Sequence, residues 1–214
     1  IDEWQKVPAV WDVVRRAVDE DPAGGQFLLT GSASPAPGAT AHSGAGRIGR
    51  LRMRPMTLSE RGIGDPTVSL GALLTGRRPA LAGECSLRLP DYVEQIVASG
   101  FPALRDLSPR ARRFQLDSYL RNAVDRDVHE QGLAVRRPEV MLAWLRAYAA
   151  ATATTASYSQ ILDAATPGQS DKPARSTSIA YRDVLTQLWL LDPVPAWWPT
   201  GSALTRLGQA PKHH

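Results

Sequence analysis

The feature that most constrains this chain is a short apolar run at residues 27–29, which ends in a Thr-Gly-Ser sequence at residues 30–32. Such a run is typical of a buried parallel strand that delivers hydroxyl side chains to the carboxyl edge of a sheet. Asp2 and Glu3 indicate the same edge of a neighbouring strand. Since about one helix's worth of sequence separates the two, a βαβ crossover is predicted.

Three further stretches complete the pattern of the N-terminal part. Residues 7–19 have apolar positions at helical spacing, which predicts a helix that buries one face against the sheet. Residues 33–46 are rich in Ala, Gly, Pro and Ser, and predict a long surface loop. Leu51 and Met53 then alternate with arginines, at the two-residue period of a half-buried strand.

The rest of the chain predicts helices. A short helix is expected at residues 70–74, a second from residue 91 to a left-handed cap at Gly100, and a third over residues 108–131. From residue 138 a helix, a short helix capped by Ser157, a longer helix at 176–191 and a Pro-Trp-rich extended segment follow one another. That is the order of a winged helix, with Trp197 and Trp198 in the wing.

Composition places few limits on function. The chain has 214 residues, 43% hydrophobic and 21% charged, which is ordinary for a globular protein. No apolar run approaches a membrane span, and a single cysteine, Cys85, fits a reducing cytoplasm, so a cytoplasmic location is expected. The net charge of +4 and the isoelectric point near 9.6 permit anionic partners without specifying one.

Several short motifs occur in a familiar order. They are Asp2-Glu3, Thr30-Gly31-Ser32, Gly46-Arg47 before a strand and Pro55, Gly100-Phe101-Pro102, and Tyr119-Leu120 followed by Asp125-Arg126-Asp127. In this order and spacing the chain resembles prokaryotic AAA-type P-loop ATPases that carry a nuclease-like C-terminal domain of unknown function. The resemblance covers nearly the whole chain but only the middle of that family's architecture.

The resemblance implies ATP and Mg²⁺ as ligands. Asp2 would hold Mg²⁺ through water and Glu3 would polarise the attacking water, as phosphoryl transfer requires. Thr30 and Ser32 would sense the γ-phosphate. Two arginines, Arg47 near the phosphates or at a subunit boundary and Arg126 in the helical lid, would contribute as well. The alternative for each is an ordinary turn or a solvated charged face.

The three lysines bear on nucleotide binding. A phosphate-binding P-loop needs a Gly-Lys-Ser/Thr sequence, but Lys6, Lys172 and Lys212 each follow a residue other than glycine. The chain also opens in the middle of a predicted strand. We therefore expect an internal fragment, whose P-loop and C-terminal domain lie outside it and which alone binds nucleotide poorly.

The predicted fold is α/β and then mostly α: a partial P-loop NTPase parallel sheet, a helical lid and a winged-helix domain. Residues 1–62 are assigned to the C-terminal half of the ATPase core, and 63–135 to the linker and lid. Residues 136–203 are assigned to the winged helix, and 204–214 to the start of a truncated domain.

Two other functions remain open at this point. The chain could be a winged-helix module that contacts DNA through Lys172, Arg175 and Arg182, although base-reading helices usually present more basic and amide side chains. A packing or protein-docking role for that helix is the alternative. The chain could also be an inactive gene remnant. Nothing in the sequence indicates the substrate, the partner or the oligomeric state.

Overall fold

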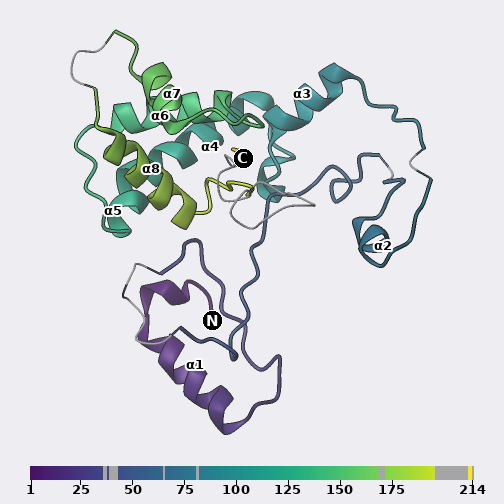
Figure 1. Ribbon diagram of the computed structural model, residues 1–214, viewed down its shortest axis with the longest axis vertical. Coiled ribbons are helices and arrows are strands. Elements are labelled where there is room, and N and C mark those ends of the chain that lie inside the picture. The colour runs from purple at the N-terminus through teal and green to yellow at the C-terminus, as the bar shows by residue number, and fades with distance from the viewer. Residues whose placement is uncertain are drawn as a thin grey trace, which may run out of the picture. The chain divides into compact units, whose positions relative to one another are not determined.

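The computed structural model describes residues 1–35, 38, 43–64, 66–80, 82–168, 172–195, 212 and 213. The chain divides into two compact units: unit 1 comprises Ile1–Gly49 and Tyr119–His214, and unit 2 comprises Arg50–Ser118. In the described residues every regular element is a helix (Figure 1), and β-pairing is limited to an isolated antiparallel bridge between Val194 and Lys212.

The predicted parallel sheet is therefore wrong. The two segments expected to form it meet through only three backbone hydrogen bonds, from the nitrogens of Ile1, Thr30 and Trp4. Leu28 in the strand expected at residues 27–29 is 75% exposed, and Leu51 in the further strand expected around residues 51–53 is 97% exposed. A parallel strand is stable when neighbouring strands pair with it and both its faces are buried. Leu28 and Leu51 meet neither condition.

The winged helix predicted for residues 136–203 is not seen as such either. Its helices are present, but the wing reduces to the Val194–Lys212 bridge among the residues the structure describes. Trp197, Trp198 and Pro199, which were expected in the wing, lie outside the described residues. The described part of this region is a set of packed helices.

The N-terminal part of unit 1 holds the 3₁₀ turn η1 (Trp4–Lys6) and helix α1 (Ala9–Glu20). Trp11 of α1 is buried and stacks on Trp4, with 4.8 Å between the ring centroids. Gly44 closes over this pair: its φ is 66°, and an added Cβ would lie 2.5 Å from Trp11 Cζ2. Only glycine combines this backbone conformation with such a close approach.

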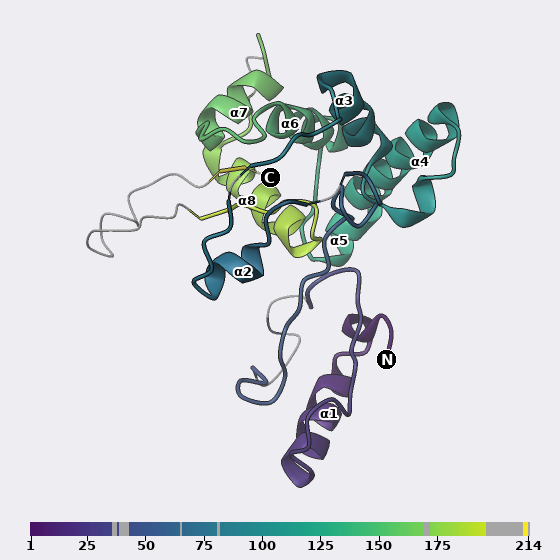
Figure 2. The same cartoon turned by 90° about the vertical axis from the view of Figure 1, so that its right-hand side faces the viewer.

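The main core of unit 1 is built by α6 (Pro138–Ala150), α7 (Tyr158–Ala165) and α8 (Arg175–Gln187), which lie side by side in Figures 1 and 2. The predicted cap of α7 is confirmed, since Ser157 and Gln160 form a reciprocal capping box. Fully buried side chains at the centre include Met141, Trp144, Tyr148 and Leu185.

Two chain segments from outside these helices join the core. Ala33 is buried in it, and the Ser34 nitrogen donates to the Gln187 carbonyl at 3.0 Å. His213 is 2% exposed, with Nε2 2.7 Å from the Ala156 carbonyl oxygen. The first contact anchors the N-terminal part of unit 1 to the end of α8.

The predicted single helix over 108–131 contains an irregularity. It runs as α4 (Pro109–Asn122), a π-helical turn η3 (Ala123–Asp127) and a short α5 (Val128–Glu130). Val124 and Val128 are fully buried, whereas Arg126 is exposed. Such π-helical turns are rare and often accompany functional sites, so residues 123–127 are a candidate position for a functional site.

Unit 2 contains α2 (Leu70–Leu74), which confirms the short predicted helix, α3 (Leu89–Ala98) and the turn η2 (Pro102–Leu104). The left-handed residue after α3 is Ser99 rather than the expected Gly100. Gly100 serves close approach instead, because an added Cβ would lie 2.6 Å from Pro55 Cβ. Across the described part of both units, no helix is long and apolar enough to cross a membrane.

Candidate functional site

The acidic pair at the N-terminus lies against the Thr-Gly-Ser segment. The Thr30 nitrogen donates to the Ile1 carbonyl at 2.9 Å, and the Trp4 nitrogen donates to the Thr30 carbonyl at 3.3 Å. Between these bonds Glu3 adopts a left-handed backbone with φ of 50°, which is uncommon for a residue other than glycine. Backbone conformations of this kind cluster at functional sites, where the surrounding contacts hold them.

Side chains then pair the two segments directly. Thr30 Oγ1 donates to Asp2 Oδ1 at 2.6 Å, and Ser32 Oγ donates to Glu3 Oε2 at 3.0 Å. Gln5 Nε2 adds a second donor to Glu3 Oε2, at 2.6 Å. The structure thus brings together four of the residues singled out from the sequence, as two acid–hydroxyl pairs.

Hydrogen bonding sets the charge of the first pair. The Thr30 hydroxyl, followed by the backbone N–H of Glu3, lowers the pKa of the Asp2 carboxyl. Both donors favour the ionised form. Asp2 is therefore a carboxylate at neutral pH, and it is exposed to solvent and able to meet a cation.

Gly31 allows the two segments to approach. An ideal Cβ at this position would lie 2.1 Å from Gln5 Oε1. That oxygen is buried and has no hydrogen-bond partner within the described residues, whereas the Gln5 nitrogen is engaged by Glu3. The absence of a side chain at Gly31 thus leaves room for the amide that holds Glu3.

A cleft of about 470 Å³ opens beside this cluster within unit 1. Glu3, Gln5, Lys6 and Ser32 line it from the N-terminal segment, and Tyr119, Arg126, Asp127 and Glu130 from the helical segment. Of the residues predicted from the sequence, Glu3, Ser32 and Arg126 line this cleft. The π-helical turn supplies both Arg126 and Asp127 to its wall.

Charges in the cleft act on one another. Arg126 Nε donates to Glu130 Oε1 at 2.8 Å, and this contact lowers the pKa of the Glu130 carboxyl. Asp127 behaves in the opposite way: burial, reinforced by the charge of Glu130, raises its pKa, while Arg126 and Lys6 oppose the rise. The cleft therefore combines one carboxylate, Glu130, whose ionised form is favoured with one carboxyl, Asp127, that binds a proton more readily than usual.

Comparison with known families classifies both parts of the chain. Residues 1–61 match a family described as AAA domain, which relates the N-terminal part to AAA-type ATPases. Residues 89–214 match a family described as Domain of unknown function (DUF8612), and this match covers more than half of the chain. The chain belongs to the DUF8612 family. No curated protein and no solved structure matches it.

These matches support part of the resemblance found in the sequence. The AAA-type relationship rests on residues 1–61, which hold all four members of the acid–hydroxyl pairs. The DUF8612 match carries no functional description, so the nuclease-like C-terminal domain stays unsupported. The DUF8612 region contributes Tyr119, Arg126, Asp127 and Glu130 to the cleft.

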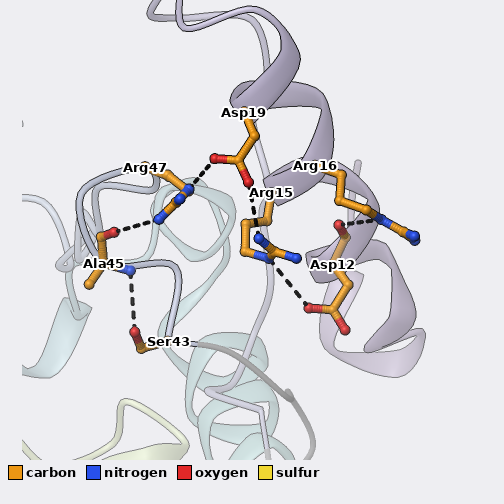
Figure 3. A network of polar contacts seen from close by, with 7 residues as sticks. All are labelled: Asp12, Arg15, Arg16, Asp19, Ser43, Ala45 and Arg47. Carbon is orange, nitrogen blue, oxygen red and sulfur yellow. Dashed lines mark hydrogen bonds and ion pairs between the residues drawn. The ribbon is translucent and has the colours of Figure 1, made fainter.

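Arg47 lies elsewhere in unit 1. Figure 3 shows its guanidinium paired with Asp19 of α1, which also accepts from Arg15 Nη1 at 3.0 Å. Arg47 Nη1 reaches the carbonyl of Ala45 at 3.4 Å. This ion pair fixes the loop around residues 43–47 to α1, and Arg47 is not among the residues lining the cleft. Its proposed place near phosphates stays a prediction.

The three bases predicted to contact DNA have different surroundings in the DUF8612 region. Lys172 Nζ lies 2.9 Å from Asp163 Oδ1, and Arg175 is the exposed first residue of α8. Arg182 lies over the Tyr158 ring, 5.2 Å from its centroid, and pairs with Asp183. Lys172 also lines a groove next to the start of α8.

Sequence reasoning missed several residues of the cleft. Lys6 was set aside because no glycine precedes it, and no local pattern would have placed it beside the helical segment. Glu130 could have been predicted from the sequence, since it follows Arg126 at the i,i+4 spacing of a helical ion pair. Within the described residues, no cluster of three or more His, Cys, Asp or Glu side chains is arranged to hold a metal ion by itself.

Proposed function

We propose that the chain is part of an AAA-type ATPase and that Asp2, Glu3, Thr30 and Ser32 form its hydrolytic edge. The observation that carries this proposal is the pairing of two acids with two hydroxyls, at 2.6 Å and 3.0 Å, inside the region that matches the AAA domain family. Nucleotide hydrolysis in the cytoplasm, where ATP is abundant, is the activity that this arrangement fits best.

The donor set fits Mg²⁺ and ATP. Mg²⁺ takes oxygen ligands and is usually bound by one or two carboxylates together with substrate phosphates and waters. Asp2, ionised and exposed, is such a ligand, and one carboxylate is enough when phosphates complete the shell. The metal, when bound, would neutralise charge on the transferred phosphoryl group.

The remaining side chains have roles suited to their geometry. Glu3, held by Gln5 and Ser32, would orient the attacking water. The hydroxyls of Thr30 and Ser32 now donate to carboxylates, and each would turn its hydrogen to a phosphate oxygen when nucleotide is present. Arg126, exposed on the wall of the same cleft, would supply positive charge toward the phosphates.

Nucleotide affinity should be low for this chain. Its sequence contains no Gly-Lys-Ser/Thr, so the lysine and backbone cradle that holds β- and γ-phosphates is missing from these 214 residues. We expect a dissociation constant for Mg-ATP on the order of 1 mM, equivalent to about −4 kcal/mol.

Isothermal titration calorimetry tests the proposal. Mg-ATP should bind to the unaltered chain, and Asp2→Ala should weaken binding at least tenfold, because it removes the metal ligand. Asp106→Ala, which removes an exposed carboxylate in unit 2, is the matched control and should leave binding unchanged. Micromolar affinity, or equal binding by the Asp2→Ala variant, would contradict the proposed site.

A further inference from the structure

A second concave surface lies in unit 1, apart from the cleft described above. It is a groove of about 590 Å³ between the segment 133–137 and the first turns of α8, and it shares no lining residue with the cleft. Its apolar wall includes Leu133, Val140, Pro173 and Tyr181. Nothing in the proposed ATPase function uses this groove.

The polar lining of the groove has a single charge sign. Arg136, Arg137 and Lys172 contribute three cations, and Ser176 and Thr177 contribute two hydroxyls. Among the described residues no Asp or Glu lines the groove. A concave surface with cations and hydroxyl donors but no acid complements an anion that carries several oxygen atoms.

Two of these cations form ion pairs with exposed acids. Arg137 Nε lies 3.5 Å from Glu139 Oε1, and Lys172 Nζ lies 2.9 Å from Asp163 Oδ1. The two acids are 71% and 66% exposed, and ion pairs of this kind contribute only about 0–1 kcal/mol. Within the described part of the chain Arg136 makes no ion pair, so an anion that binds to this guanidinium displaces no acid from it.

The start of α8 adds to the positive potential. Its N-cap residue, Ala174, provides no side-chain hydrogen bond, and its first turn holds no acid. The unpaired N–H groups at the beginning of a helix carry partial positive charge, which has the same sign as the three cations of the groove.

We infer that this groove binds the sugar–phosphate backbone of a nucleic acid. The cations come from two separate segments, at 136–137 and 172, and their exposed side chains form an open surface rather than an enclosed cage for one small anion. Backbone phosphates presented in succession match such a surface, and cations and hydroxyls are the groups that contact them. Among the residues that the structure describes, the lining has no Asn, Gln or acid to read base edges, so we expect binding that is independent of sequence.

The test is fluorescence anisotropy with the full 214-residue chain and a labelled 20-base-pair duplex, between 50 and 200 mM KCl. The test variant is R136A/R137A/K172A. The control is R77A/R78A/R110A, which removes the same charge from exposed positions in unit 2. Circular dichroism establishes that both variants keep the helical content of the unaltered chain.

Three lost phosphate contacts should lower the slope of log affinity against log salt by about 2.7, at about 0.9 per phosphate. Over this fourfold change in salt, the unaltered chain should therefore lose about 40-fold more affinity than the test variant. The control should match the unaltered chain. Equal slopes for the two triple variants, or no binding by the unaltered chain, would overturn the inference.

Two competitors separate a nucleic-acid groove from other anion sites. At matched ionic strength, unlabelled duplex should displace the probe, whereas inorganic phosphate and polyglutamate should not. Displacement by inorganic phosphate would show a site for single phosphate groups, and equal displacement by polyglutamate would show a site for acidic polypeptides. Either result would overturn the assignment to nucleic acid. Failure here leaves the Asp2 site untouched, since the two sets of residues are separate.

Discussion

The buried hydrogen bond between α6 and α8 allows a direct test of the helix packing in unit 1, the unit that contains both the cleft and the groove. Trp144 Nε1 donates to Ser178 Oγ at 2.8 Å, and both side chains are fully buried. Ser178→Ala would leave the indole N–H buried without an acceptor. A buried unsatisfied donor costs about 1–3 kcal/mol, offset by the roughly 0.5 kcal/mol that alanine gains in helix propensity.

The net loss in free energy of unfolding should therefore be about 0.5–2.5 kcal/mol. With a denaturant slope of about 2 kcal/mol/M, the urea midpoint should fall by about 0.25–1.25 M. Tryptophan fluorescence is the right signal, because all six tryptophans belong to unit 1. Ser176→Ala, an exposed serine of the same helix, is the matched control and should stay within about 0.5 kcal/mol of the unaltered chain. Equal midpoints for the two variants would refute the reasoning.

Two further outcomes follow from the structure. The raised pKa of Asp127 means that ionising this carboxyl costs more free energy in the folded than in the unfolded chain, so its contribution to stability falls as pH rises above about 4. Asp127→Asn should therefore be more stable than the unaltered chain at pH 7 and lose that advantage near pH 3. Urea midpoints that differ equally at both pH values would contradict this. His213→Ala removes a buried ring whose centroid lies 4.8 Å from that of Tyr148 and 5.3 Å from that of Tyr158, and it should lower the free energy of unfolding by about 2–4 kcal/mol in urea. His129→Ala, at an exposed position, is its control. A similar small effect of both substitutions would show that the His213 ring does not support the core.

The sequence by itself determined the helices. Apolar spacing, the Ser157 cap and the helix start expected at residue 108 depend on residues within one or two turns, and the corresponding helices α7 and α4 are present. It also singled out the acids at 2 and 3 and the hydroxyls at 30 and 32, which the structure pairs. Helical hydrogen bonds are local, so a local pattern is enough to predict them.

Tertiary structure decided the rest. The run at residues 27–29 has the composition of a strand, yet a strand depends on neighbours that local sequence does not specify, and Leu28 stays exposed. The cleft brings Lys6 beside Asp127, and the groove brings Arg136 beside Lys172, across separations that no periodicity connects. Local features allow these contacts. Gly31 has no side chain and so leaves room for Gln5, and the π-helical turn places Arg126 on the wall of the cleft. Side chains distant in sequence meet only where packing brings their backbones together, and this non-local dependence separates the sites from the helices.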